Sequence, residues 1–433
     1  MNFYEVLFAK KINGGGGGGS VQPLSVTANG TYTAESGGYS PVTVNVGDFD
    51  YENLKEVALI DYDGTLLHNY TAEEFLALDS LPANPSHTGL VAQGWNWTLA
   101  EAKTFVQTYG CLCIGQNYKT DDASTRLYYS VDSDILGYET KLIVDIVSGS
   151  VTIDWGDGSA TTTTSGTGNK TVKHTYASTG DYIIKITLNS GTYKLGNSMM
   201  SGSFTDDYYF SGMGLKKVEV GEGCVAIHKN AFTNLFNVET ISIPTDLVTF
   251  GDSNGSDVFS TTKIKAIVFP PSANYYGNSN LSATCIFASM HNVTLQSQSY
   301  VALGLGSKLA MLTGVFNYGP QVGGNGGVIN LRYLAAGGSY TKVAGNYGVT
   351  KAFKLKRAVI PSSVTEISDY AFQNSRGVYH LLPSSVPSLA NTRAFTGALK
   401  IYVPYSADHS ILTAYKTATN WLSYASIMEE EPQ

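Results

Sequence analysis

The feature that most constrains this chain is an apolar–proline pair that returns along its second half. The pairs are Ile243-Pro244, Phe269-Pro270, Ile360-Pro361, Leu382-Pro383 and Val403-Pro404. A phenylalanine that follows a small or apolar residue alternates with them, at Phe232, Phe259, Phe287, Phe372 and Phe395. A period of roughly 20–29 residues, as the last three prolines show, is typical of a solenoid, in which no unit buries its apolar face alone and neighbours must stack.

One unit, LKRAVIPSSVTEISDYAFQNS at residues 355–375, resembles the BspA-type leucine-rich repeats. The resemblance implies that each unit is a strand, a turn at the proline, a second short strand and a turn anchored by the phenylalanine. We predict a leucine-rich-repeat solenoid over residues 196–398, with a divergent glycine-rich stretch at 291–350. Residues 399–433 are predicted to be a last strand and a capping helix, because an end repeat without a cap would expose its apolar side.

Composition limits the class of protein. Of the 433 residues, 43% are hydrophobic and 14% are charged, which excludes a disordered tail or a long coiled coil. The 46 glycines and 29 tyrosines favour turn-rich β structure, so we expect a mainly β, multidomain protein. The net charge of -8 argues against a nucleic-acid partner. No apolar run approaches the roughly 20 residues of a membrane span, so no membrane insertion is expected.

The chain begins with a short amphipathic peptide, residues 1–12, followed by a poly-Gly linker, residues 13–20. The apolar residues of the peptide are Phe3, Tyr4, Leu7, Phe8 and Ile12. Because the linker is flexible, we predict that the peptide docks on a partner and orders there, with a frayed terminus as the alternative. Glu5 and the late lysines are unlike a signal peptide, so we expect no export by the usual secretory route.

A small β module is predicted for residues 21–47. Two alternating runs of apolar and polar residues lie there, with turn signals at Asn29-Gly30 and Gly37-Gly38.

Residues 48–135 predict an α+β module. Its clearest helix covers residues 98–110, where Thr98 and Glu101 form a capping box and Gly110 ends the helix. The strands on either side of residues 119–122 are predicted to form a hairpin.

Residues 136–195 turn wholly to β patterns and resemble a PKD-type, immunoglobulin-like sandwich. The resemblance is carried by Trp155-Gly156-Asp157-Gly158, His174, Tyr176, Gly180 and Tyr182. It implies a fold and says little about activity. Asp154, Asp157 and Asp181 are candidate Ca²⁺ ligands. We favour turn and strand-end roles for these carboxylates, so no metal site is predicted.

The segment VALIDYDGTLL at residues 57–67 resembles the first motif of haloacid-dehalogenase-type phosphatases. The resemblance implies Asp61 as the nucleophile and Asp63 as the general acid, with Asp121-Asp122 as candidate Mg²⁺ ligands. That chemistry needs a sizeable doubly wound α/β core, and too little chain follows Asp61 before the sequence becomes purely β. We therefore favour a turn that closes a strand over a catalytic site.

The chain has four cysteines, Cys111, Cys113, Cys224 and Cys285. The first two share one face of a strand, as two ligands of a metal would, but no second pair and no histidine pattern completes a site. We predict buried free thiols and no cofactor.

Aromatic residues near glycine- and asparagine-rich loops are the candidate binding surface. They are Tyr275, Tyr276, Tyr318, Tyr333, Tyr340 and Tyr347. Tyrosine offers a large contact area at a low entropic cost, which suits sugar or protein epitopes. Packing between solenoid layers is the alternative for each of them.

The N-terminal segments together resemble structural proteins of tailed phages and prophages of gut bacteria. The resemblance is carried by the start of the chain, by PLSVTANGTYT and YSPVTVNV, and by LPANPSHTGLVAQGWNWTLAEAK. It implies docking on other virion proteins through the N-terminus, several copies or a homo-oligomer on the particle, and a place on the virion surface after synthesis in the host cytoplasm.

We therefore predict a non-enzymatic tail or baseplate adhesin that binds a host surface glycan or protein through its repeats, with weak sites multiplied by copy number. Three alternatives remain open. They are a head or tail decoration fibre with weak adhesion, a bacterial surface adhesin, and a haloacid-dehalogenase-like phosphatase.

Overall fold

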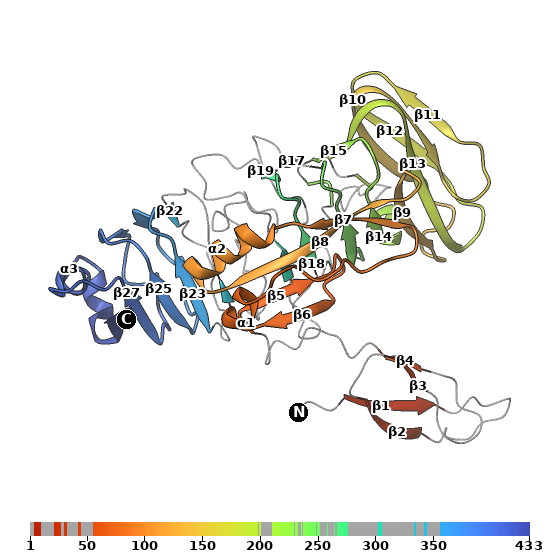
Figure 1. Cartoon of the computed structure of the whole chain (residues 1–433). Helices are drawn as coiled ribbons and strands as arrows, with labels where there is room; N and C mark the ends of the chain where they lie inside the picture. The colour runs from red at the N-terminus through yellow and green to blue at the C-terminus, as the bar shows by residue number, and fades with distance from the viewer. Residues whose placement is uncertain are drawn as a thin grey trace. The chain divides into compact units, whose positions relative to one another are not determined.

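The computed structural model divides the chain into two units, residues 1–54 and 55–433. It describes residues 55–197, 199–200, 210–228, 230–232, 237–247, 249–251, 266–275 and 356–433, single positions at 235, 258 and 264, and the strands at 4–9, 21–26, 30–32, 42–44, 302–304, 333–334 and 342–343. The second unit contains the repeats and all the side chains discussed below (Figure 1).

The first unit contains two antiparallel strand pairs. β1 (Tyr4–Ala9) pairs with β2 (Val21–Val26), and β3 (Gly30–Tyr32) pairs with β4 (Val42–Val44). The predicted docking peptide therefore contributes a strand that pairs within its own chain. Phe3 and Ile12, and the side chains of Tyr4, Leu7 and Phe8, lie outside the described residues, so docking stays a prediction.

The second unit begins with an α+β module that we name the cover, residues 55–120. Its elements are β5 (Val57–Ile60), β6 (Leu66–Tyr70), α1 (Ala72–Leu76), β7 (Leu90–Trp95), α2 (Leu99–Tyr109) and β8 (Leu112–Thr120). The sheet order is β6-β5-β8-β7, and β5–β8 is its parallel pair. The capping box at Thr98 and Glu101 is confirmed, and Gly110 ends α2 with a φ of 75°.

The predicted hairpin around residues 119–122 is wrong. β8 pairs with β5 and β7, whereas the next strand, β9 (Thr125–Val131), leaves the cover and pairs with β13 and β14. The hairpin pattern was local, but each strand finds its partner elsewhere in the fold.

The middle of the chain is a β-sheet module. Its strands are β10 (Thr140–Asp154), β11 (Thr162–Ser165), β12 (Gly168–His174) and β13 (Gly180–Leu195). The long β10 pairs with the other three. The Tyr176 hydroxyl donates to the carbonyl of the buried Trp155 at 3.0 Å, and the Tyr182 hydroxyl donates to the carbonyl of Ser178 at 2.9 Å. These bonds fix the ends of the strands.

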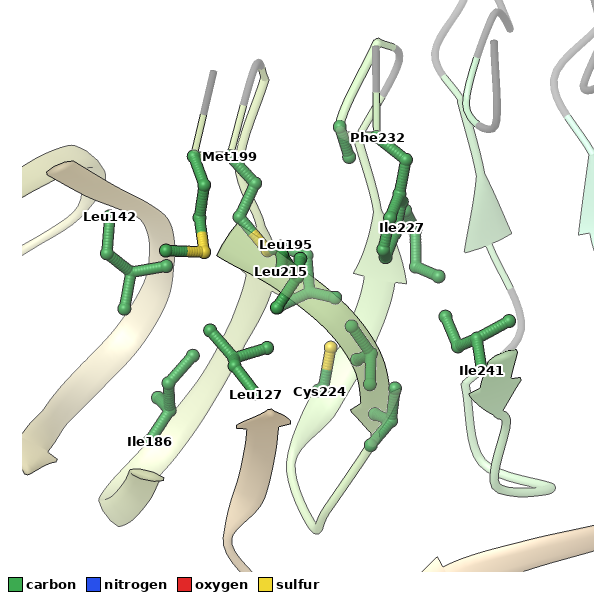
Figure 2. Close-up of a cluster of buried hydrophobic side chains, with 14 of the residues drawn as sticks. Leu127, Leu142, Ile186, Leu195, Met199, Leu215, Cys224, Ile227, Phe232 and Ile241 are labelled. Atoms are coloured by element: carbon green, nitrogen blue, oxygen red, sulfur yellow. The ribbon is translucent and has the colours of Figure 1, made fainter. Parts of the chain in front are cut away.

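The repeats follow without a break in the sheet. The end of β13 pairs in parallel with β15 (Cys224–Ile227), and β9 pairs with β14 (Leu215–Glu219), which follows the short helix η1 (Phe210–Gly214). Figure 2 shows Leu142 of β10 and Ile186 of β13 in the same apolar cluster as Phe232 and Ile241 of the first repeats. One core therefore serves both modules.

Two series of short strands make up the repeats. We call the two series together the repeat ladder, and each of their strands a rung. The first series is β14, β16 (Thr240–Ser242), β18 (Ala266–Val268), β20 (Ala302–Gly304), β21 (Tyr333–Leu334), β23 (Arg357–Ile360), β25 (Val378–Leu381), β27 (Lys400–Val403) and β28 (Met428–Glu430). The second is β15, β17 (Thr249–Phe250), β19 (Asn274–Tyr275), β22 (Lys342–Val343), β24 (Glu366–Ile367) and β26 (Ser388–Leu389). In the first series β14 pairs in parallel with β16, β18 with β20, and β21 to β28 with one another in order; in the second series the parallel pairs run β15–β17–β19 and β22–β24–β26.

The anatomy of each described unit matches the repeat prediction. The amide of Val364 donates to the carbonyl of Pro361 at 3.1 Å, which forms the turn at the proline. Phe372 and Phe395 stack from successive units with their ring centroids 5.2 Å apart. These two buried phenylalanines therefore tie successive units together.

The C-terminal end is closed by α3 (Ser410–Thr417), the 3-10 helix η3 (Trp421–Ile427) and β28. The buried Trp421 donates its indole N–H to the carbonyl of Pro387 at 2.8 Å, and the Tyr415 hydroxyl donates to the carbonyl of Pro383 at 2.8 Å. Both bonds hold the cap against the last repeats.

Candidate binding face on the repeat ladder

The first strand series presents one side to the core and the other away from it. Core positions alternate along each rung, so the residues between them share the opposite side, which we name the outer face. Its members are Lys217, Glu219, Ser242 and Val268 on the N-terminal rungs β14–β18, and His380, Lys400, Tyr402 and Glu429 on the C-terminal rungs β25–β28.

The cover lies on the outer face of the N-terminal rungs. The side-chain amide of Asn117, on β8, donates to the carbonyls of Ile243 at 3.0 Å and Val268 at 3.2 Å. Asn96 donates in the same way to the carbonyl of Phe269 at 2.8 Å. Residue 115 is glycine because β8 passes against Val268: a Cβ built there would stand 2.4 Å from a Val268 methyl carbon. An extended strand with amide side chains therefore fits across the rungs.

A buried carboxylate is neutralised at the edge of this contact. Glu219, whose side chain is 2% exposed, lies 2.7 Å from the Lys217 amine and 3.4 Å from the Arg126 guanidinium. The Tyr128 hydroxyl donates to Glu219 at 2.8 Å, and Lys217 donates to the Tyr62 hydroxyl of the cover at 3.1 Å. Burial alone would lower the pKa of Lys217, but its bonds to Glu219 and Tyr62 raise it.

Polar atoms without a hydrogen bond gather in the same contact. Among the described residues, the buried atoms Gln116 Oε1, Asn117 Oδ1, Thr120 Oγ1 and Ser242 Oγ have no partner, and Arg357 Nε, beside Gly110 at the end of α2, has none either. A buried polar group that lacks a bond costs about 1–3 kcal/mol. The contact between the cover and the repeats is therefore polar, and some of its buried polar atoms lack a hydrogen bond.

The C-terminal rungs carry a similar set of groups, of which Lys400 and Tyr402 are half-buried, Glu429 is exposed and His380 is buried. Lys400 lies 2.6 Å from Glu429, whose side chain is 57% exposed, and its amine stands 5.7 Å from the centroid of the Tyr402 ring. His380 stacks on Tyr402 with centroids 5.1 Å apart and lies 2.6 Å from Glu431. The bond to Glu429 raises the pKa of Lys400.

A second group of accessible residues lies beyond the end of β27, where Glu430 pairs in register with the core residue Val403 and so does not share the outer face. His409 lies 2.7 Å from Glu430 and meets the edge of the Tyr405 ring, which is 44% exposed. Leu399, at the start of the same rung, is 50% exposed. We name the accessible residues at this end of the repeats, on the outer face and beyond β27, the terminal patch; they are Leu399, Lys400, Tyr402, Tyr405, His409 and Glu429–Glu431.

The six tyrosines chosen from the sequence lie elsewhere. Tyr275 and Tyr333 fall within β19 and β21, but their side chains, with Tyr276, Tyr318, Tyr340 and Tyr347, lie outside the described residues. Sequence reasoning missed Tyr402 and Tyr405. The signal was present, because Lys400 and Tyr402 alternate with the core residues Ile401 and Val403.

Asp61 occupies a turn, as the sequence favoured. The Gly64 amide donates to the Asp61 carbonyl at 3.0 Å, and the turn joins the antiparallel strands β5 and β6. The Asp61 carboxylate lies 2.7 Å from His87, and burial raises its pKa. Asp122, one of the two candidate Mg²⁺ ligands, forms ion pairs with Arg126 and Lys185, each at 2.9 Å.

Two of the three candidate acids of the β-sheet module have turn roles, and the third, Asp181, lies in β13 opposite Ser130. Asp154 accepts from the amide of Gly156 at 2.9 Å, and Asp157 accepts from the amide of Ser159 at 3.0 Å. Burial opposes ionisation of Asp157, but bonds from Ser159 and His174 lower its pKa to about 2. Within the described ranges, no three His, Cys, Asp or Glu side chains are grouped so as to hold a metal ion.

The described cysteines are free thiols. Cys111 and Cys224 are buried, Cys113 is half-buried, and burial raises the pKa of each to about 12. Cys285 lies outside the described residues. In the part of the chain that the structure describes, no helix has the length and apolar character of a membrane span.

Comparison with known proteins identifies the repeats. Residues 203–299 and 336–402 match the BspA type leucine rich repeat region in six copies, which confirms the repeat prediction. A crystal structure of a leucine rich cell surface protein from Faecalibacterium prausnitzii A2-165 is similar at 12% identity, with a TM-score of 0.24 over 52% of this chain and 62% of that one. No curated protein matches the chain.

Proposed function

We propose that this chain is a non-enzymatic adhesion protein, displayed on a surface, that binds its ligand through the outer face of its C-terminal rungs. One observation carries the proposal. The outer face is occupied by the chain's own cover at the N-terminal rungs, whereas the same kind of face at the C-terminal rungs presents Tyr402, Lys400 and Glu429 to solvent.

The bacterial surface is the setting that the BspA-type repeat match fits best. A phage tail adhesin, or a decoration fibre with weak adhesion, rests on the resemblance of the N-terminal segments. Antibody labelling of producing cells and of purified phage particles separates the two settings. Label on cells that carry no particles supports a bacterial surface, and label on particles supports a phage protein.

Binding of the labelled full chain to a panel of gut bacterial and epithelial cells tests the proposal. We expect saturable binding to at least one cell type, competed by unlabelled chain. Exchange of both Tyr402 and Tyr405 for alanine is expected to weaken it at least 10-fold, because central aromatic residues carry most of an interface's binding energy. Tyr138, which is 49% exposed and lies outside the patch, provides the control Tyr138→Ala. Absence of saturable binding to every cell type contradicts the proposal.

A further inference from the structure

We propose that the cover is a lid, which opens as one folded body about its single link to the repeat ladder and uncovers the outer face of the rungs from β14 to β18. The structure describes the closed form, in which the cover keeps a ligand from that part of the face. The inference concerns regulation of the proposed binding face, and in that respect it rests on the proposed function. Four properties of the described residues lead to it.

The first property is that the cover and the ladder have separate apolar cores. Val57, Leu59 and Ile114 belong to a cluster within the cover, whereas the rungs beneath it place Ile241 and Ile267 in the core on their other side. Both helices of the cover have their own capping boxes. Opening therefore leaves both cores intact.

The second property is the kind of contact between them. Besides the bonds of Asn117 and Asn96 to rung carbonyls, the Thr245 amide donates to the Gln93 side chain of β7 at 2.7 Å. In the described structure β16 pairs with β14 and β18 pairs with β20, so the cover bridges a place where two rungs are not bonded to each other. Burial of Val268 favours the closed form, but water can replace each of these hydrogen bonds when the cover leaves.

The third property is that closing leaves polar atoms without hydrogen bonds. Asn117 Oδ1 and Ser242 Oγ come from the two sides of the contact, and both side chains are fully buried and lack a partner for these atoms among the described residues. At the far end of the cover, Arg357 Nε, beside Gly110, is buried without a partner as well. Because water would satisfy these atoms, each of them favours the open form.

The fourth property is the connection between the two bodies. The cover is the first part of the second unit, so the chain joins it to the ladder once, through residues 121–124 between β8 and β9. This link is fixed to the ladder, since the Glu222 amide donates to the Ala123 carbonyl at 2.9 Å. A body that is joined at one end can swing about that end without distorting the rungs.

Thiol labelling measures the opening with no ligand present. Cys111 is buried next to the start of β8 and faces away from Leu112, which belongs to the cover's core. We expect the opening constant obtained from Cys111 with iodoacetamide to exceed by at least about 10-fold those obtained from hydrogen exchange of the α2 amides and from labelling of Cys224, because the lid opens without unfolding.

Two variants distinguish a lid from an ordinary packed interface. Ser242→Ala removes a hydroxyl that is unsatisfied only in the closed form, so it should slow the labelling of Cys111 several-fold. Asn117→Ala removes the donor to two rung carbonyls and should speed the labelling several-fold. Ser165→Ala, at the exposed end of β11, is the control and should change nothing. Circular dichroism melting shows that each variant is folded.

A disulfide tests what the lid does to binding. A Cβ built at Gly115 stands 3.0 Å from the Val268 Cβ, close to the spacing in a disulfide, so Gly115→Cys/Val268→Cys should fasten the cover to the ladder on oxidation. Mass spectrometry identifies the bond. The oxidised form should resist labelling at Cys111, and it should bind cells at least about 3-fold more weakly than the same variant after reduction. The parent chain with and without reductant is the control.

Three results overturn the inference. Equal opening constants at Cys111, α2 and Cys224 show that the cover leaves only when the whole chain unfolds. Labelling that Ser242→Ala leaves unchanged or speeds shows that the closed contact is not strained by this hydroxyl. Equal cell binding by the oxidised and reduced forms shows that the covered rungs take no part in binding. The proposed function fails only when no cell type binds the parent chain, and the labelling then still decides whether the lid opens.

Discussion

The two ends of the repeat ladder carry the same three groups in opposite surroundings. Lys217 and Glu219 lie beside Tyr128 at one end, and Lys400 and Glu429 lie beside Tyr402 at the other. The glutamate side chain is 2% exposed in the first set and 57% exposed in the second.

The difference comes from what lies on the outer face. At the N-terminal end the cover supplies Asn117 of β8 and Tyr62, and Arg126 of the neighbouring strand β9 neutralises the buried carboxylate. At the C-terminal end the charged or titratable partners of the glutamates, among the described residues, are histidine and lysine from the repeats and their cap. Similar rungs can thus serve as a structural contact or as an open surface, depending on whether another segment of the chain covers them.

The largest expected effect separates the two ends as folding units. Trp421→Ala removes a buried side chain that contacts Phe395 and Tyr415, and it should cost about 3–5 kcal/mol. Limited proteolysis should then cut within residues 356–433 while residues 55–197 stay protected, because the two ends have separate apolar cores. Leu422→Ala, at the 65% exposed neighbour, is the matched control and should melt like the parent chain. Uniform cleavage of both regions would show that the ends are not independent.

The next comparison uses the two glutamates themselves. Glu219→Ala removes the buried carboxylate that Lys217, Arg126 and Tyr128 share, although Arg126 keeps Asp121 and Asp122, and it should destabilise the chain by about 1–3 kcal/mol in denaturant unfolding. Glu429→Ala removes the equivalent partner of Lys400 in solvent and should not shift the melting temperature measurably. Equal losses of stability in the two variants would mean that the N-terminal pair is as solvated as the C-terminal one.

A methyl group added at residue 115 tests the contact between β8 and the repeat ladder. Gly115→Ala would bring a methyl group against Val268 and should cost about 1–3 kcal/mol. Shortening the opposing side chain in the double variant Gly115→Ala/Val268→Ala should recover part of that loss, and the double-mutant cycle measures the coupling. Strict additivity would indicate that β8 does not press on Val268.

Thiol labelling reports smaller openings of the cover. Burial raises the pKa of Cys111 to about 12, so in the folded chain at pH 8 it should react with iodoacetamide only when the cover opens. Gly115→Ala should speed this reaction several-fold. Cys224, buried in the core shared by the β-sheet module and the first repeats, should stay unlabelled in both forms, as mass spectrometry of the peptides would show. Equal acceleration at both cysteines would point to global unfolding instead.

The smallest expected effect concerns the turn at Asp61. Asp61→Asn keeps a group that can accept from the Tyr62 amide and bond to His87, and it removes a buried charge, so stability should change by less than about 1 kcal/mol. The parent chain with Mg²⁺ should release no phosphate from generic monoesters. Phosphate release that the variant loses would restore the phosphatase alternative.

Local signals in the sequence were sufficient for the repeats and the helix ends. The proline and phenylalanine pairs specify a unit that recurs, and Thr98, Glu101 and Gly110 act within one turn of α2. The placement of the cover depends on contacts between residues far apart in the chain, such as Asn117 with Ile243, which no local pattern reports.

The same reason explains the misread hairpin and the missed site. β8 and β9 have the turn and alternation of a hairpin, but β8 carries the buried amides of Gln116 and Asn117 and pairs within the cover. Tyr402 stands at an ordinary alternating position of the last repeat. Its role depends on the outer face being open there, and that openness is a property of the whole fold.

Hydroxyl-radical footprinting of the folded, free chain tests the central claim most directly, because side chains are oxidised in proportion to their exposure. The structure predicts ready modification of Tyr402, Tyr405 and His409 on the terminal patch, and protection of Tyr62 and Tyr118 in the cover until the chain is unfolded. Equal rates of modification at the two ends would contradict the account of one face that is covered at its N-terminal rungs and open at its C-terminal rungs.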